Sequence, residues 1–233
     1  MNDITNTNLY TPAKNIWWIE GTTPEIFQQE FDSIYQKALD GKLRGLNKSL
    51  AGDIDKEYKV VHSREFLDFI VNTYKSYLSE IRSNTTSKVL DWNDSLFKIE
   101  QWINIQTKNE SNPVHAHSGL LSYVFWHKVP YTLEEELKLS NNSADYPGDF
   151  NFLYCDVDKQ FVKNNNFGAY SISNLISHSL KIYKDKENHF AIFPAWLSHY
   201  VTKFLSTDEH RVTFSGNLGL PFQGKAKATK SII

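Results

Sequence analysis

Cysteine and methionine are almost absent from this chain of 233 residues, which contains one of each. The single Cys155 excludes an internal disulfide and any zinc cluster built from several cysteines, and it suits a reducing compartment. No stretch approaches the roughly 18 apolar residues of a membrane-spanning helix, and the polar N-terminus lacks the apolar core of a secretory signal. We therefore expect a cytoplasmic protein that does not enter the membrane.

An excess of charge of one sign is also lacking. Lys and Arg total 25 and Asp and Glu total 27, which gives a net charge of −2 at pH 7. Proteins that bind nucleic acid usually carry a basic surface that neutralises phosphates. Nucleic acid is therefore not the expected partner of this chain.

Aromatic residues, in contrast, are abundant. The chain contains 15 Phe, 12 Tyr and 6 Trp, which together make up 14% of its residues. With so little methionine, the volume of the core must come from rings and branched aliphatic side chains, and both favour β-sheet. The composition therefore argues against a helical bundle or a coiled coil.

The length fits a single domain over residues 1–233, in which two regions differ in their apolar period. In residues 1–90, apolar side chains recur at helical spacing after Pro24 and again after Ser63, and Gly41 marks the end of the first helix. We expect these ninety residues to form a mostly helical support for the rest of the chain.

From about residue 96 the apolar period changes to two, which predicts β-strands. The candidate strands are a segment around Trp102 and residues 120–129, 150–155, 179–184, 189–193, 198–204 and 211–218. Polar connections without an evident helix predict an antiparallel sandwich or barrel over 96–220, followed by a flexible tail at 224–233. The long polar segment 131–188 fits a role in recognising either a substrate or a partner.

Three of the eight histidines form a pattern that suggests a metal site. His115 and His117 are separated by one residue, so in an extended segment both imidazoles project to the same side. His199 lies far downstream in another predicted strand. An antiparallel barrel can bring two neighbouring histidines and a distant one to a single metal ion, with coordination positions left open. Taken alone, a His-x-His pair is more often explained by chance or by exposure at the surface.

Arg211 and Thr213 are predicted to share one face of the last strand. A guanidinium beside a hydroxyl at the mouth of a barrel can bind a carboxylate through charge-assisted hydrogen bonds. The alternative is an ion pair between Arg211 and a surface acid such as Asp208 or Glu209.

The order and spacing of these residues resemble a known family. A His-x-His pair precedes a strand that ends in proline, a Phe-Pro dipeptide precedes a third histidine, and Arg-x-Thr is followed by asparagine. This pattern resembles the iron(II)- and 2-oxoglutarate-dependent oxygenases, and it is most similar to a bacterial and phage group with a His-x-His motif. The matching residues within 97–220 are Trp102, Asn104, His115, His117, Ser122, Pro130, Phe193, Pro194, His199, Arg211, Thr213 and Asn217.

The resemblance implies an α+β fold that is mainly β: a double-stranded β-helix (a cupin-like jelly roll) packed against the N-terminal helices. It also implies that His115, His117 and His199 bind Fe(II). Most members of the superfamily have Asp or Glu at the position that His117 occupies here. A neutral imidazole in place of a carboxylate removes one negative charge from the metal site.

The resemblance further assigns residues to the cosubstrate. Arg211 would pair with the distal carboxylate of 2-oxoglutarate, Thr213 would add a hydrogen bond, and Asn104 would contact the cosubstrate. Separately from the resemblance, Trp102 and Trp126 lie on strands that flank the motif, where their rings either line a substrate pocket or pack in the core. The implied reaction is hydroxylation of an unidentified small molecule or peptide by C–H abstraction and rebound, with release of succinate and CO2.

Two other functions fit the same sequence. The imidazole of His117 is compatible with a three-histidine, cupin-like dioxygenase that does not use 2-oxoglutarate. A jelly roll that serves only as a binding or structural module is the other alternative.

Overall fold

The computed structural model describes residues 6–46, 50–85, 97–141, 146–155 and 175–219. The predicted tail at 224–233 lies outside these residues. The elements in chain order are β1 (Thr7–Ala13), β2 (Ile16–Thr22), a 3₁₀ turn (Glu25–Phe27), α1 (Gln28–Leu39), β3 (Glu57–Lys59), α2 (Arg64–Ser76), α3 (Leu78–Asn84), β4 (Phe97–Gln106), β5 (Asn112–His115), β6 (Leu121–Lys128), α4 (Leu133–Leu139), β7 (Phe150–Cys155), β8 (Leu175–Leu180), a second 3₁₀ turn (Lys184–Lys186), β9 (His189–Pro194), β10 (Ser198–Val201) and β11 (Arg211–Gly219).

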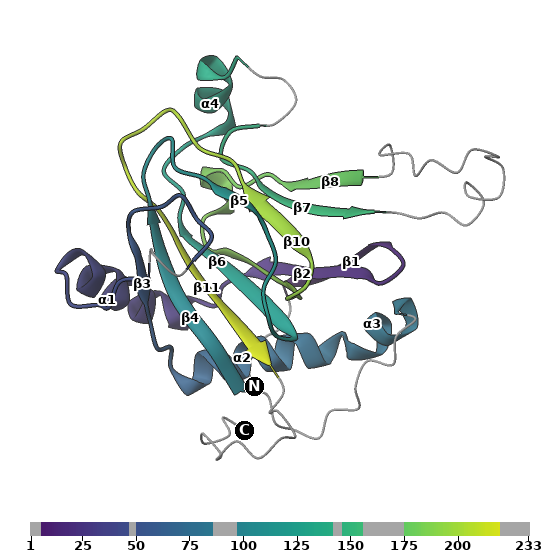
Figure 1. Ribbon diagram of the computed structural model, residues 1–233. Helices are drawn as coiled ribbons and strands as arrows, with labels where there is room; N and C mark the ends of the chain where they lie inside the picture. Colours follow the sequence, from purple (N-terminus) through teal and green to yellow (C-terminus); the bar gives the residue numbers. More distant parts are fainter. Residues whose placement is uncertain (1–5, 47–49, 86–96, 142–145, 156–174, 220–233) are drawn as a thin grey trace.

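The strands form two antiparallel sheets, shown in Figure 1. The larger sheet has the order β1-β2-β9-β6-β11-β4-β3, and the smaller has the order β5-β10-β7-β8. From β4 onward the chain passes repeatedly between the sheets: β4, β6, β9 and β11 belong to the larger one, while β5, β7, β8 and β10 belong to the smaller one. This winding is a double-stranded β-helix, so the predicted jelly-roll fold is confirmed.

The larger sheet is buried on both faces because successive residues of a strand point to opposite sides. On β6, Phe125 packs with the helices in one apolar cluster, while its neighbour Trp126 belongs to a second cluster between the two sheets. The helices α1 and α2 contribute Phe31 and Phe66 to the first cluster. Figure 1 shows α2 running along the larger sheet. Residues on the inner face are therefore available to line a site between the sheets.

The N-terminal region contains more sheet than the sequence predicted. The helices are present, with α2 capped by the Ser63 hydroxyl, which accepts a hydrogen bond from the amide of Phe66. The expectation of mostly helix for residues 1–90 nevertheless omitted β1, β2 and β3, which extend the larger sheet at its two edges. Most β1 side chains are exposed or partly exposed, and β3 has only three residues, so neither strand carries a clear apolar alternation.

Several strand boundaries also differ from the predicted ones. The candidate strand at 179–184 is β8, which ends at Leu180, and the candidate at 198–204 ends at Val201. The polar segment 131–188 contains a short helix, α4, whose Thr132 and Glu135 form a capping box. None of the described helices has the length and apolar character needed to cross a membrane.

Replacing Phe125 with alanine should lower the free energy of unfolding by about 3 to 5 kcal/mol, because its ring is fully buried and packs against Phe66 and Phe190. Urea denaturation followed by circular dichroism measures this loss. The matched control is Ile26→Ala at a side chain that is 63% exposed, which should change stability by less than about 0.5 kcal/mol. Equal effects of the two substitutions would contradict the described core.

Candidate metal centre

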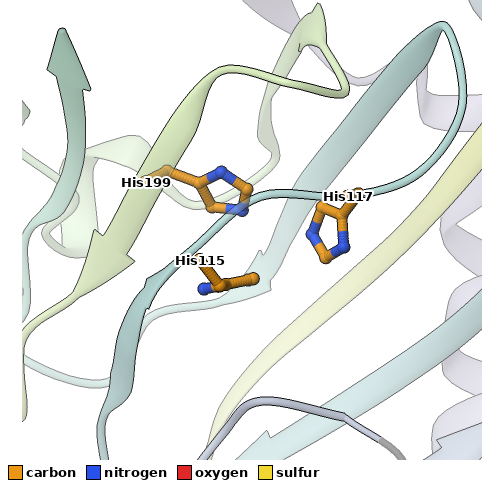
Figure 2. A group of neighbouring side chains, drawn as sticks. All are labelled: His115, His117 and His199. Atoms are coloured by element: carbon orange, nitrogen blue, oxygen red, sulfur yellow. The ribbon is translucent and has the colours of Figure 1, made fainter.

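Strand pairing brings the three predicted histidines together. β5 and β10 are antiparallel neighbours, and their register places His199 directly opposite His115. His117 follows β5, and its backbone N–H donates a 2.8 Å hydrogen bond to the carbonyl of Ala195. The ligand-capable nitrogens of the three rings all lie within 4.8 Å of one another. In Figure 2 the three rings face one another across a small space.

Backbone carbonyls fix the orientation of two of these rings. The Nδ1–H of His115 donates to the carbonyl of Pro113 at 2.7 Å, and the Nδ1–H of His199 donates to the carbonyl of Leu197 at 2.9 Å. A carbonyl oxygen can only accept, so the proton must be on Nδ1 and the lone pair on Nε2. Metal-binding histidines are commonly oriented in this way by a hydrogen bond from the second ring nitrogen.

Burial keeps the three imidazoles neutral. Desolvation, with a smaller contribution from the neighbouring His115, lowers the pKa of His117 to about 4. Desolvation, with contributions from His115 and His117, lowers the pKa of His199 to about 3, although the hydrogen bond to Leu197 opposes this shift. The pKa of His115 is lowered by burial as well. Neutral imidazoles are the form that binds metal ions.

The arrangement fits a divalent transition-metal ion. Two nitrogens bonded to one ion at about 2.1 Å lie at most about 4.2 Å apart, so small rotations of the rings suffice for all three to bind. Imidazole ligands suit iron, zinc, copper and nickel, and three of them on one side leave positions open for other ligands. The cluster contains no Asp or Glu among the described residues.

All eight residues assigned to a site from the sequence line one cavity between the sheets. Its empty volume is about 520 Å³, part of which is open to solvent. The eight are Asn104, Trp102, His115, His117, Trp126, His199, Arg211 and Thr213. On the larger sheet, Thr213 of β11 lies directly opposite Asn104 on one side and Trp126 on the other. The cavity therefore contains the metal candidates and the predicted cosubstrate residues together.

Arg211 points into the fold and not toward the surface. Only 2% of the residue is exposed, and its guanidinium donates to the Gln106 side-chain oxygen, the Tyr131 hydroxyl at 2.7 Å and the Gly148 carbonyl at 2.8 Å. It makes no ion pair with a carboxylate of the described residues, and Asp208 pairs with Lys108 instead. The alternative of an ion pair between Arg211 and a surface acid is therefore not found among the described residues.

The buried charge of Arg211 makes its end of the cavity favourable for an anion. These contacts use four of its five N–H groups: the Nε proton, both Nη1 protons and one of the two on Nη2. The second N–H on Nη2 has no hydrogen-bond acceptor among the described residues. Thr213 lies two residues along the same strand and lines the same cavity. A carboxylate can accept from both groups.

Aromatic rings form much of the wall near the histidines. The Phe150 ring stacks on His199 with centroids 5.3 Å apart, and Phe193 meets the same imidazole edge-on at 4.9 Å. Trp102 lies 5.4 Å from His117, and Trp126 packs edge-on against Phe150. These rings exclude water from one side of the histidine cluster and hold His199 in place.

The other five histidines lie away from this cluster, in agreement with their having no predicted role. His62 contacts Glu30, His127 contacts Asp32 and His210 contacts the Tyr35 hydroxyl. His178 packs against Trp18, and His189 lies near Lys186.

Sequence reasoning missed the residues that hold Arg211. Gln106 is on β4 opposite Arg211, Tyr131 follows β6, and Gly148 precedes β7. Gln106 continues the alternation of Trp102 and Asn104 on the same strand, which is a signal that could have identified it. Tyr131 and Gly148 reach Arg211 only in the folded structure, and no local sequence pattern links them to it.

The fold and the cavity together define a jelly-roll protein with a candidate metal centre. The sequence pattern of the family described as "Putative 2OG-Fe(II) oxygenase" matches residues 100–217, which is just over half of the chain. The chain therefore belongs to this family of 2-oxoglutarate- and Fe(II)-dependent oxygenases, and its cofactors are Fe(II) and 2-oxoglutarate.

Solved structures with very different sequences are similar to this one. A prolyl-4-hydroxylase from Pseudomonas putida has 10% identity and a TM-score of 0.50, with 88% of this chain and 92% of that chain covered. HygX from Streptomyces hygroscopicus, solved with nickel, 2-oxoglutarate and hygromycin B, has 12% identity and a TM-score of 0.48, covering 88% and 83%. At such identities the likeness to the hydroxylase supports the fold alone. No curated protein matches the sequence.

Replacing His199 with alanine should weaken Fe(II) binding by more than about 100-fold. This loss of affinity is larger than the loss expected for a residue that only orients a metal ligand. An anaerobic titration of the purified protein with Fe(II) measures the change. The control is His189→Ala, because His189 lies outside the cluster and its loss should leave the affinity unchanged. Wild-type affinity in the His199 variant would contradict this metal site.

Proposed function

We propose that this protein hydroxylates a C–H bond of a small molecule or peptide, with Fe(II) held by His115, His117 and His199. The observation that supports the proposal most is the presence in one cavity of three neutral, converging imidazoles and a buried arginine that makes no ion pair with the described residues. The first group suits a metal ion and the second suits a dicarboxylate cosubstrate.

In this proposal the distal carboxylate of 2-oxoglutarate binds to Arg211 and Thr213. The remaining Nη2–H of Arg211 and the Thr213 hydroxyl donate to it, while Gln106, Tyr131 and Gly148 keep the guanidinium in place. Asn104, opposite Thr213, contacts the same cosubstrate through its amide. These contacts would orient the keto acid toward the histidines.

Bound Fe(II) supplies the oxidative chemistry, in which O2 and 2-oxoglutarate yield succinate, CO2 and a hydroxylated substrate. The contribution of the protein is binding, orientation and exclusion of water. Trp102 and Trp126 line the cavity with little exposure to solvent, so they are proposed to form part of the substrate pocket.

Removing the positive charge of Arg211 should weaken 2-oxoglutarate binding. We expect Arg211→Met to raise the dissociation constant by about 10- to 100-fold, because a charge-assisted hydrogen bond and the attraction of a dianion are lost. Calorimetry with the Co(II)-loaded protein measures the affinity, and mass spectrometry of succinate in the aerobic Fe(II) protein measures turnover. Affinity for the metal alone should not change.

An unchanged affinity of Arg211→Met for 2-oxoglutarate would contradict the assigned cosubstrate site. Oxygen consumption by the wild-type protein that does not depend on 2-oxoglutarate would instead favour the three-histidine dioxygenase.

His117 is the residue at which the metal site departs from the usual carboxylate of the superfamily. If its imidazole is a ligand, His117→Asp should retain a 1:1 metal stoichiometry, whereas His117→Ala should weaken Fe(II) binding by more than about 100-fold. The same anaerobic titration compares the two variants. Wild-type affinity in His117→Ala would show that His115 and His199 bind the metal without it.

A further inference from the structure

Glu57 is a buried acid that the proposed reaction does not use. It lies on β3, at the edge of the larger sheet, where the β3–β4 register places it directly opposite Asn104 (Figure 1). Directly paired residues on neighbouring strands share a face and have Cβ atoms about 5 Å apart. The side chain of Glu57 therefore lies next to Asn104, on the face that lines the cavity.

Its carboxyl group is enclosed without a hydrogen-bond donor. Glu57 is 1% exposed, and neither Oε1 nor Oε2 accepts a hydrogen bond from any residue in the described part of the chain. The backbone at Gly52 closes over it so tightly that a Cβ at that position would lie 2.9 Å from Oε1. Burying an ionised carboxylate in such a place costs much more free energy than burying a protonated one.

The surroundings of Glu57 favour the protonated form. Burial, with a smaller contribution from the negative charge of Glu110, raises the pKa of its carboxyl to about 7. Glu110 itself accepts hydrogen bonds from the backbone of Asp55 and Thr107. Other charged or titratable side chains on β3, β4 and the segments that adjoin them include Arg44, Asp53, Asp55, Lys56, Tyr58, Lys59, Glu100, Lys108, His210 and Arg211.

The side-chain oxygen of Asn104 also lacks a hydrogen-bond donor among the described residues. Its Oδ1 is buried and accepts no hydrogen bond from the described residues, whereas its Nδ2 is not enclosed in this way and the residue lines the cavity. 2-Oxoglutarate, ionised at both carboxylates, carries only hydrogen-bond acceptors. It can therefore bind to the Nδ2–H₂ end of the amide but is repelled by the Oδ1 end.

We propose that Glu57 is a positioning residue for 2-oxoglutarate: its protonated carboxyl donates to Oδ1 of Asn104 and thereby directs the Asn104 NH₂ group toward the cosubstrate. Ionised Glu57 instead accepts a hydrogen bond from that NH₂ group, which turns Oδ1 toward the cavity and opposes binding. This inference rests on the proposed function, since it assumes that 2-oxoglutarate lies beside Asn104.

The test measures the dissociation constant of 2-oxoglutarate for the Co(II)-loaded protein by calorimetry, from about pH 6 to about pH 8, on either side of the Glu57 pKa. Glu57→Gln is the matched variant, because its amide donates to Oδ1 at every pH. The quantity compared is the dissociation constant of the wild type divided by that of Glu57→Gln, in which the effects of all other titrating groups cancel. We expect this ratio to be near 1 at about pH 6 and to rise to about 10 at about pH 8, where ionised Glu57 no longer donates a hydrogen bond.

Glu57→Leu removes the donor at every pH and should bind 2-oxoglutarate about tenfold more weakly than Glu57→Gln throughout. In an Asn104→Leu background, Glu57→Leu should have no further effect, because the proposed action passes through Asn104. Carbon-13 NMR of the Glu57 carboxyl in the metal-free wild type provides a measurement that needs no variant. Its resonance should titrate near pH 7, together with the side-chain amide of Asn104.

Any one of three results would overturn the role of Glu57. The ratio could stay constant with pH, the Gln and Leu variants could bind 2-oxoglutarate equally tightly, or the chemical shift of the Asn104 amide could stay unchanged while Glu57 titrates. In that event Arg211→Met would still weaken binding, and the proposed function would stand. Wild-type protein that does not bind 2-oxoglutarate at any pH would overturn both proposals.

Discussion

The antiparallel pairing of β5 with β10 is the constraint on which the candidate site depends. It places His199 opposite His115, and the hydrogen bond from His117 to Ala195 brings the third imidazole to the same place. The alternation of side chains then turns one face of β4, β6 and β11 toward these histidines and the other toward the helices. A slip of one residue in these strands would exchange the two faces and replace the polar cavity wall with apolar side chains.

The charges around the cavity follow from the same geometry. The three imidazoles are neutral, and the cavity also contains the buried Arg211, whose positive charge opposes the rise that burial causes in the pKa of the Asp149 carboxyl. A site with a carboxylate ligand would carry one negative charge more. In the proposed complex, the dianionic cosubstrate would accept hydrogen bonds from Arg211 and Thr213. Glu57 is the nearby acid whose ionisation would oppose this arrangement.

The residues of the candidate site were easier to identify from the sequence than the residues that hold them in place. His115, His117, His199 and the Arg211-x-Thr213 pair were recognisable because spacing along a strand maps directly onto one face. Gln106, Tyr131 and Gly148, which hold Arg211, come from three separate segments that only the tertiary fold brings together. Glu57 was missed for the same reason: β3 has three residues, and nothing local in the sequence shows that Glu57 faces Asn104. The strands β1 and β3 lacked the periodicity that identified β4 and β6, since they lie at the edges of the sheet.

The most direct test of this account is a crystal structure of the anaerobic complex with Fe(II) and 2-oxoglutarate. The account predicts one iron ion bonded to a nitrogen of His115, His117 and His199 at about 2.0 to 2.2 Å. It also predicts the distal carboxylate of 2-oxoglutarate within hydrogen-bonding distance of Arg211 and Thr213. Iron bound away from these histidines, or a cosubstrate carboxylate that does not contact Arg211, would contradict it.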